Sequence, residues 1–176
     1  MKVDVRPATS DDLAAATTVE RLAFEAARGG DSADDIVRAI EEVHDLPGSL
    51  SMVAVDRDTV VGHAQFSRAW VGETPVLVLG PLGVTPGEWR RGIGSRLVIL
   101  GLEEARARGE IAVLLVGDPG FYQRFGFVPA SRFGLRNPVA GVQPNGFVIA
   151  EEHLQIAPLD ERASSLTGEV VWHSAL

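Results

Sequence analysis

The sequence predicts an α/β (α+β) fold in which helices flank a mixed, mostly antiparallel sheet with one parallel strand pair. Three observations support this prediction. Apolar residues recur at helical spacing over residues 13–43, the period changes to two over residues 52–70, and a strand, helix, strand succession runs from 76 to 116. Because such a succession implies a right-handed crossover, its two strands are expected to be parallel.

The N-terminal quarter is predicted to form an edge strand and two helices. Residues 2–6 alternate charged and apolar side chains. The polar turn at residues 9–12 can cap a helix whose apolar residues are Leu13, Ala16, Val19, Leu22 and Phe24. Gly29-Gly30 is expected to end this helix, and a second helix is expected after Asp31-Ser32.

The core of the sheet is predicted to lie between Met52 and Val84. The segments Met52–Val55 and Val60–Trp70 are predicted to form a hairpin about residues 56–59. Val76–Val84 is almost continuously apolar, which is typical of a strand buried on both faces.

The second half of the chain completes the crossover and then becomes irregular. A helix is expected over residues 92–108 and the next strand over residues 111–116. A short helix should follow Asp118-Pro119-Gly120, and strand-like segments recur at 147–150 and 170–172. Because ligands favour the carboxyl edge of parallel strands, the loop between Val84 and Gly94 is a candidate binding site.

Composition favours one soluble domain over residues 1–176. The 176 residues are 45% hydrophobic, which suffices for one substantial core. No export signal is visible at the N-terminus, and the longest apolar run is far shorter than the ~18 residues of a membrane span. We therefore expect a cytoplasmic protein without a membrane partner.

Charge and residue usage exclude several classes of function. The chain has no cysteine, so disulfides, thiol catalysis and thiolate metal sites are excluded. A net charge of −8 disfavours nucleic-acid binding, which needs a basic surface. The four histidines show no metal-ligand spacing, and no Gly-x-Ser-x-Gly turn indicates a serine hydrolase. We expect neither a metal nor a nucleic-acid partner.

The segment Trp89-Arg90-Arg91-Gly92-Ile93-Gly94-Ser95 opens a helix after an apolar strand. Glycines let backbone N–H groups approach a phosphate, and a helix start presents unpaired donors at a positive dipole end. The segment lacks the Gly-Lys-Ser/Thr of a nucleotide phosphate loop and the third glycine of a dinucleotide fingerprint. It predicts a pyrophosphate site of another kind. A tight connection with solvated arginines is the alternative.

The chain's only tyrosine lies in the segment Gly117-Asp118-Pro119-Gly120-Phe121-Tyr122-Gln123-Arg124-Phe125-Gly126-Phe127. Together the two segments resemble the GNAT superfamily of N-acetyltransferases, and more specifically its small bacterial branch. In that superfamily a strand, a glycine turn and a helix bind coenzyme A, and a later tyrosine meets the cofactor's sulfur. The resemblance implies a GNAT-type fold with the parallel strand pair at the cofactor cleft.

The resemblance also implies roles for individual residues. The strand end at residues 82–84 would pair with the pantetheine arm, amides from residues 91–95 would bind the pyrophosphate, and Arg90 or Arg91 would reach phosphate oxygens. The implied cofactor-binding residues are Leu82, Gly83, Val84, Arg90, Arg91, Gly92, Ile93, Gly94, Ser95 and Tyr122. Trp89 stands where the superfamily usually has Gln or Arg, and Leu115 stands where it often has Asn.

Acetyl transfer to an amine needs a neutral nucleophile, a polarised thioester carbonyl and help for the departing thiolate. Tyr122 is the candidate catalytic residue, expected to stabilise the thiolate by a hydrogen bond. The alternative for Tyr122 is a packed aromatic side chain. For the general base the sequence leaves His63, Glu88, Asp118 and water open, and Asp118 could instead cap the helix after Pro119.

These observations lead to the hypothesis of an N-acetyltransferase that uses acetyl-coenzyme A as acyl donor and attacks it directly in a ternary complex. The acceptor would be a primary amine of a small molecule or a peptide. The alternative is an acyl-coenzyme A-binding regulatory module without productive transfer. Residues 131–145 could cover the acceptor, and residues 170–172 could complete a sheet or a homodimer interface.

Overall fold

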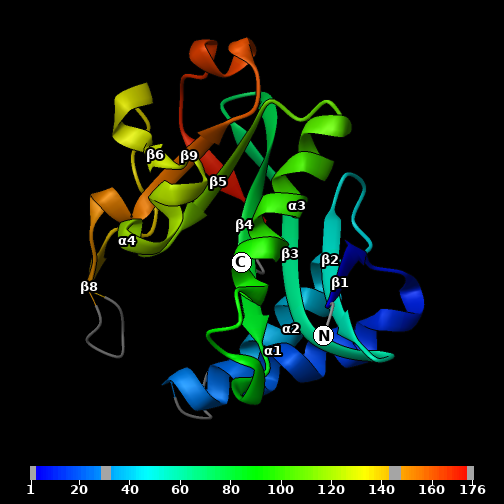
Figure 1. Cartoon of the computed structure of the whole chain (residues 1–176). Helices are drawn as coiled ribbons and strands as arrows, with labels where there is room; N and C mark the ends of the chain where they lie inside the picture. Colours follow the sequence, from blue (N-terminus) through cyan, green and yellow to red (C-terminus); the bar gives the residue numbers. More distant parts are fainter. Residues whose placement is uncertain (1–2, 29–32, 143–147, 174–176) are drawn as a thin grey trace. The chain divides into compact units, whose positions relative to one another are not determined.

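The computed structural model describes residues 3–28, 33–142 and 148–173 (Figure 1). Some of the predictions above concern Lys2, Gly29-Gly30, Asp31-Ser32 and residues 143–147, which lie outside the described residues.

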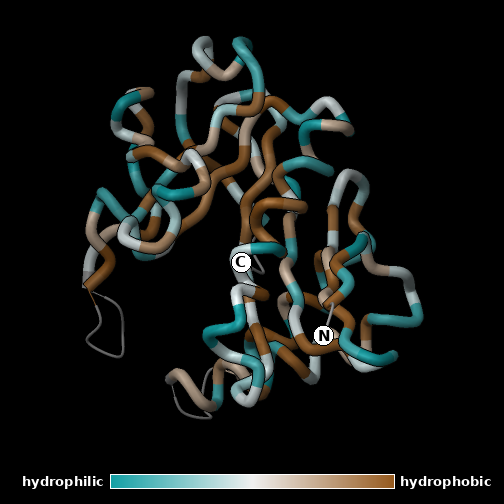
Figure 2. Tube along the Cα trace, in the orientation of Figure 1, coloured by the Kyte–Doolittle hydropathy of each residue, from teal (hydrophilic) through white to brown (hydrophobic). Residues whose placement is uncertain are grey.

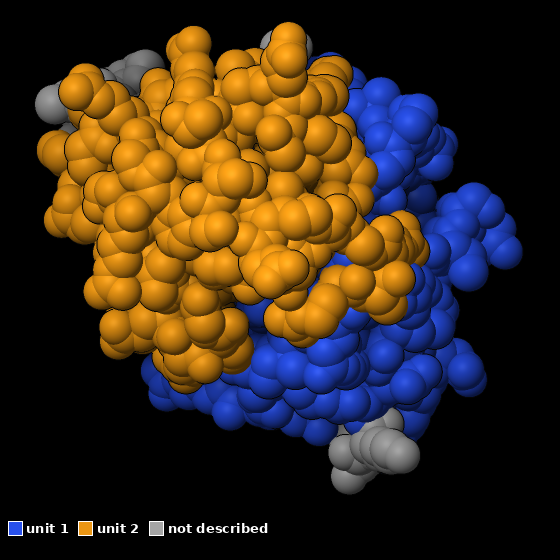
Figure 3. Space-filling model, turned by 90° about the horizontal axis from the view of Figure 1, so that it is seen from above, with its two compact units in different colours: residues 1–67, 79–105, 174–176 blue, residues 68–78, 106–173 orange. Residues whose placement is uncertain are grey.

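The chain divides into two compact units, which Figure 3 shows in different colours. Unit 1 comprises residues 1–67, 79–105 and 174–176, and unit 2 comprises residues 68–78 and 106–173. The single domain over residues 1–176 stays a prediction.

The strands of unit 1 follow the predicted hairpin. The element bounds are β1 (Asp4–Pro7), β2 (Leu50–Asp56), β3 (Thr59–Val71) and β4 (Thr74–Val84), of which β3 and β4 run on into unit 2. β1 pairs with β2 and β2 with β3, in both cases antiparallel, and β4 is a further neighbour of β3. Arg57 and Asp58 both have positive φ angles, of 47° and 64°, as a tight two-residue hairpin turn requires.

Three of the four predicted helices lie in unit 1, except for the last two residues of the third, which belong to unit 2. Their bounds are α1 (Leu13–Arg28), α2 (Ala33–Val43) and α3 (Ile93–Ala107). The turn before α1, a 3-10 helix η1 (Ser10–Asp12), is stabilised as expected: Thr9 donates its backbone N–H to the Asp12 carboxylate at 2.8 Å. α1 ends at Arg28, directly before the Gly29-Gly30 that was expected to end it.

Helices α1 and α3 pack on opposite faces of the sheet in unit 1. His63 on β3 contacts Glu20 on α1, whereas a Cβ at the neighbouring Gly62 would lie 2.9 Å from Ile93 and 3.0 Å from Leu97 on α3. Because successive strand residues point to opposite faces, the two contacts identify the two faces. Figure 2 shows the strands as predominantly hydrophobic and the turns as hydrophilic.

Unit 2 contains the predicted parallel pair. β5 (Ala112–Val116) runs parallel to β4, with Leu77 opposite Val113 and Val78 opposite Leu114. The helical crossover between these strands was the basis of this prediction, which is confirmed. β10 (Val170–Trp172) pairs antiparallel with β3, so the C-terminal strand belongs to the sheet.

The largest omission of the sequence prediction is β9 (Leu154–Pro158), which pairs antiparallel with β5 along its whole length. Four successive buried residues, among them the polar Gln155, hide any alternation in this strand, and Pro158 ends it. β6 (Val128–Pro129) pairs with β9, and β7 (Gly141–Val142) with β8 (Val148–Ile149) in a separate two-stranded sheet. Within the described residues the strand order of the main sheet is β1-β2-β3-β4-β5-β9-β6.

The remaining elements are single turns of helix. They are η3 (Pro86–Glu88) in unit 1 and, in unit 2, α4 (Pro119–Tyr122), η4 (Gln123–Phe125), η5 (Ala130–Phe133), η6 (Glu151–His153) and η7 (Glu161–Ser165). The predicted fold class, a mixed and mostly antiparallel sheet with a parallel pair and flanking helices, is confirmed. Among the described residues, no helix has the length and apolar character needed to span a bilayer.

Candidate active site

The predicted phosphate-binding turn connects β4 to α3 within unit 1. Thr85 donates its N–H to the Val61 carbonyl at 2.9 Å, which fixes the end of β4 against β3. The backbone at Arg90 and Gly92 has positive φ angles of 63° and 76°. The N–H of Arg96 closes the first turn of α3 on the Gly92 carbonyl at 3.1 Å. The amides before Arg96 therefore have no acceptor one turn earlier in the helix and are the ones that a helix start offers to an anion.

The two glycines of the turn leave open space. A Cβ at Gly92 would meet no atom within 4 Å, and a Cβ at Gly94 would meet only the Val84 side chain, at 3.9 Å. The positive φ of Gly92 accounts for glycine there. No packing against the described residues requires glycine at position 94. The turn thus fits a group that approaches the backbone from outside, as a pyrophosphate would.

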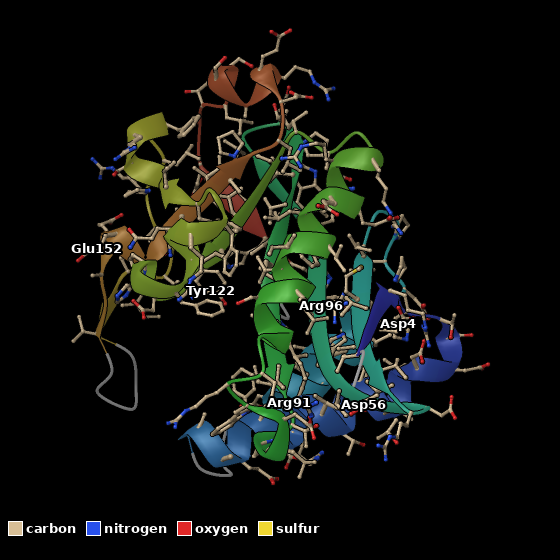
Figure 4. The ribbon with its side chains drawn as sticks, in the orientation of Figure 1. Asp4, Asp56, Arg91, Arg96, Tyr122 and Glu152 are labelled. Atoms are coloured by element: carbon tan, nitrogen blue, oxygen red, sulfur yellow. The ribbon has the colours of Figure 1, made fainter. Side chains whose placement is uncertain are left out.

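The three arginines near the turn differ in their surroundings. Arg91 forms an ion pair with Glu88 and lies 3.9 Å from the Asp56 carboxylate, toward which it points in Figure 4. Arg96 donates to the Val3 carbonyl at 2.5 Å. Arg90 is exposed and has the strained left-handed backbone conformation given above. Of the two arginines expected to reach phosphate oxygens, Arg91 is held by carboxylates.

Trp89 links the turn to the end of β4. Its indole N–H donates to the Val84 carbonyl at 2.6 Å, while 45% of the residue remains exposed. The residue that departs from the superfamily's pattern therefore anchors the turn to the strand end. Leu82 and Val84 are half-buried, and Gly83 between them is buried.

The most unusual polar contacts in unit 1 involve His63. The His63 ring is fully buried, with Nδ1 2.8 Å from Glu20 Oε1 on α1 and Nε2 3.0 Å from Ser51 Oγ on β2. Glu20 is also fully buried. Burial, the dominant cause, raises the pKa of the Glu20 carboxyl, although the His63 ring and the Gly83 amide act in the opposite direction.

The Glu20 side chain takes the place of a side chain at Gly83. A Cβ at Gly83 would overlap Glu20 Oε2 and lie 2.8 Å from its Cδ. The same Oε2 atom makes no hydrogen bond with the described residues, although the Gly83 amide lowers the pKa of the carboxyl. Position 83 therefore requires glycine, because any side chain there would overlap the buried Glu20 carboxyl.

Sequence reasoning did not single out Glu20, although a signal existed. Ala16, Val19 and Ala23 form the buried stripe of α1, and Glu20 follows Ala16 by four residues on that stripe. A glutamate on an apolar stripe is the pattern of a buried, partnered carboxyl.

The other two candidates for the general base have structural partners. Glu88 pairs with Arg91. Asp118 accepts the N–H of Gly120 at 2.9 Å and caps α4, as the alternative reading of the sequence had it. Water as the base stays a prediction.

Tyr122 lies in unit 2, at the end of α4, and is half-buried among aromatic rings. Its ring meets those of Phe121 and Phe127 edge-on, at centroid distances of 4.9 and 5.8 Å. A Cβ at Gly117 would lie 2.6 Å from its ring, so the glycine makes room for it. The Arg124 guanidinium lies 4.8 Å from the Phe121 ring centroid, and its Nε donates to the Phe121 carbonyl at 2.8 Å. The ring of Tyr122 is therefore held in one orientation by its neighbours.

Among the residues that the structure describes, no group of three or more His, Cys, Asp or Glu side chains could hold a metal ion. Unit 1 therefore holds the turn and the buried polar side chains, and unit 2, described by itself, holds the aromatic cluster around Tyr122.

The family described as "Acetyltransferase (GNAT) family" matches residues 16–127. The chain belongs to the GNAT acetyltransferase family. The match begins in α1, ahead of Glu20, and ends at Phe127, so it includes both motifs.

Individual GNAT proteins agree with this assignment. The chain is 32% identical over 145 residues to the uncharacterized N-acetyltransferase YjhQ of Escherichia coli K12, covering 77% of this chain and 75% of YjhQ. It resembles the crystal structure of E. coli YhbS in complex with CoA at a TM-score of 0.82 and 26% identity, covering 99% of this chain and 92% of YhbS. A GNAT family acetyltransferase of Brucella melitensis in complex with acetyl-CoA has a TM-score of 0.73 and 26% identity, over 99% of this chain and 97% of that protein.

Proposed function

We propose that this chain uses acetyl-coenzyme A to acetylate a primary amine of a small molecule or peptide, by direct attack in a ternary complex. The observation that carries the proposal is the open backbone turn before α3, where Gly94 faces space that no described residue fills. The two GNAT structures that contain CoA or acetyl-CoA support the choice of donor.

The turn is proposed to hold the donor through its backbone. Amides from Arg91 to Ser95 would bind the pyrophosphate, and the exposed Arg90 precedes them directly. Arg91 would join them only by exchanging Glu88 and Asp56 for a phosphate. The strand end at Leu82, Gly83 and Val84 would line the pantetheine arm.

Tyr122 is proposed to stabilise the departing thiolate by a hydrogen bond from its hydroxyl. In the transfer the amine nitrogen forms a bond to the thioester carbonyl carbon, the C–S bond breaks, and the thiolate takes up a proton. A backbone N–H near Val84 would polarise the carbonyl. Packing of the Tyr122 ring against Phe121 and Phe127 supports this role, because a fixed ring positions its hydroxyl in advance.

The decisive test combines calorimetric binding of coenzyme A with thiol release from acetyl-coenzyme A against a pooled library of amines. Tyr122→Phe removes only the hydroxyl and leaves the edge-on ring contacts in place. If the hydroxyl bonds the thiolate, we expect turnover to fall roughly ten- to a hundredfold with unchanged cofactor binding, as for one lost hydrogen bond to a charged group. Unchanged turnover would remove Tyr122 from the mechanism.

The alternative, a regulatory module that binds acyl-coenzyme A without transfer, gives a different result in the same experiment. It predicts tight binding of coenzyme A and no thiol release with any member of the library. Absence of binding would contradict both functions. The cytoplasmic location, the homodimer and the covering role of residues 131–145 stay predictions.

A further inference from the structure

A chain of hydrogen-bonded polar side chains crosses the interior of unit 1 from α1 to β2. It consists of Glu20, His63 and Ser51, with Oε1 to Nδ1 at 2.8 Å and Nε2 to Oγ at 3.0 Å. Glu20 and His63 are fully buried, whereas Ser51 is partly exposed. The chain therefore has an inner end at the Glu20 carboxyl and an outer end at the Ser51 hydroxyl.

At the inner end of the chain, one oxygen of the Glu20 carboxyl accepts no hydrogen bond from the described residues. Glu20 Oε2 has no aligned hydrogen-bond partner among the described residues, and it lies where a Gly83 side chain would be. A buried carboxylate oxygen without a partner is costly and needs an explanation. Gly83 belongs to the strand end that the proposed function assigns to the pantetheine arm, so this oxygen faces the donor strand.

The same face of β3 carries two more buried oxygens without partners. Gln65 and Ser67 follow His63 at intervals of two residues and therefore point to the same side of the strand. Both residues are fully buried, and neither Gln65 Oε1 nor Ser67 Oγ makes a hydrogen bond with the described residues. A row of such oxygens favours a ligand that brings N–H donors, as an amine does.

We propose that Glu20, His63 and Ser51 form a proton relay, in which Glu20 accepts the proton of the incoming amine and the other two carry it to solvent. The relay rests on the proposed acetyl transfer. It assigns the general base to a residue of α1 and makes His63 its positioning and transfer partner.

The protons balance as follows. A protonated amine loses one proton to the Glu20 carboxylate, and the neutral nitrogen then attacks the thioester carbonyl. The proton passes from the carboxyl to Nδ1 of the His63 ring, which starts with its proton on Nε2; the ring gives that Nε2 proton to Ser51 Oγ, and the Ser51 hydroxyl proton leaves to water. Before the next turnover the ring loses its Nδ1 proton and regains one from water at Nε2 through the Ser51 hydroxyl, which restores the starting tautomer. The second N–H proton neutralises the thiolate as the C–S bond breaks. The net products are the amide, coenzyme A and one proton in solvent.

The charged groups around Glu20 are compatible with its proposed role as the general base. Among the described residues His63 is the titratable group that acts on it. The charged side chains of α2, which packs on α1, are exposed, and Glu88 on η3 pairs with Arg91. The pKa of Glu20 is raised by burial, which brings a carboxyl closer to the neutral range in which a general base works best.

The experiment compares two nucleophiles in thiol release from acetyl-coenzyme A. Ethylamine is protonated at neutral pH and must lose a proton before it attacks, whereas hydroxylamine is already uncharged. We expect Glu20→Gln to lower kcat for ethylamine about 100-fold, the usual contribution of a general base, and to leave the hydroxylamine rate within about threefold. Glu25→Gln makes the same change at an exposed position of α1 and should alter neither rate.

The pH profile gives a second readout. Wild-type kcat for ethylamine should fall on the acid side as Glu20 becomes protonated, and Glu20→Gln should abolish this acid limb. Ser51→Ala, at the partly exposed end, should lower the ethylamine rate several-fold while the protein stays folded. In the ligand-free protein, the ¹⁵N shifts of the His63 ring should change in both variants, because Glu20→Gln replaces the carboxylate beside Nδ1 by a neutral amide and Ser51→Ala removes the hydroxyl beside Nε2.

Two results would overturn the relay. The first is a Glu20→Gln protein whose kcat does not distinguish the nucleophiles, because it falls equally for both or for neither. The second is a wild-type protein that binds coenzyme A but turns over neither nucleophile. The proposed function is judged separately, by coenzyme A binding and the amine library, so its failure is distinguishable. Should Glu20→Gln not fold, the Ser51→Ala rates and ring shifts decide.

Discussion

Replacing Gly94 by alanine separates the stability of the fold from the binding of the donor. Gly94 is the second residue of α3, and an added Cβ would have only the Val84 side chain nearby, at 3.9 Å. Within the protein the substitution is therefore free of strain. At the surface it places a methyl group over the amides proposed to bind pyrophosphate.

The two expected effects have opposite signs. Alanine restricts the unfolded chain and favours the helix, so the free energy of unfolding should rise by about 0.5 kcal/mol. Loss of one backbone hydrogen bond to a charged phosphate costs about 1.5–3 kcal/mol, which corresponds to roughly a ten- to hundredfold weaker Kd for coenzyme A.

Thermal unfolding without ligand and calorimetry with coenzyme A measure the two effects on one sample. Gly101→Ala is the matched control in the same helix, because its Cβ would overlap the Phe66 ring. The control should lose about 1–3 kcal/mol of stability through overpacking while its folded fraction binds coenzyme A normally. A Gly94→Ala protein that binds coenzyme A as tightly as wild type would refute the reasoning about the turn.

Two further predictions concern stability. Gly83→Ala should lower the free energy of unfolding by about 2–4 kcal/mol in urea titrations, because its Cβ displaces the buried Glu20 carboxyl, whereas Gly87→Ala, with no atom within 4 Å of its Cβ, should change it by less than about 0.5 kcal/mol. Arg6, whose guanidinium donates to the Asp12 carboxylate at 2.7 and 3.0 Å, holds the Asp12 pKa below its usual value. The ionised Asp12 carboxylate therefore stabilises the folded protein fully above its unfolded pKa of about 4, and this stabilisation is lost as the pH falls toward the lower folded pKa. Asp12→Asn should thus lower the free energy of unfolding by about 1–2 kcal/mol at pH 7 and by progressively less below pH 4. A loss of stability that does not change with pH would contradict the ion pair.

Local patterns were sufficient for most of the fold. The hairpin, the helices and the parallel pair follow from periodicity and from the right-handed crossover, which depend on residues close in sequence. β9 was missed because its pairing with β5 joins segments about 40 residues apart and its burial on both faces removes alternation. For such a strand the pattern alone does not distinguish a buried strand from an apolar loop.

The site shows the same division between local and distant information. The backbone turn at residues 90–95 is a local feature and was predicted in the right place, between a strand and a helix. The partner of His63 could not be identified, because 43 residues separate it from Glu20 and only the packing of α1 on the sheet brings them together. Arg90 or Arg91 was expected to reach phosphate oxygens, and the pairing of Arg91 with Asp56 likewise depends on a strand distant in sequence.

Three glycines at the end of β4 and in the turn before α3 are present for three different structural reasons. Gly92 is needed for its left-handed backbone, Gly83 for the carboxyl of Glu20 behind it, and Gly94 for nothing within the protein. Only the third position is therefore a direct probe of the donor. Loss of binding after a change at Gly83 or Gly92 would report on the fold as well as on the ligand, whereas a loss at Gly94 reports on the ligand alone. The proposed pyrophosphate site depends on that one position more than on the two arginines beside it.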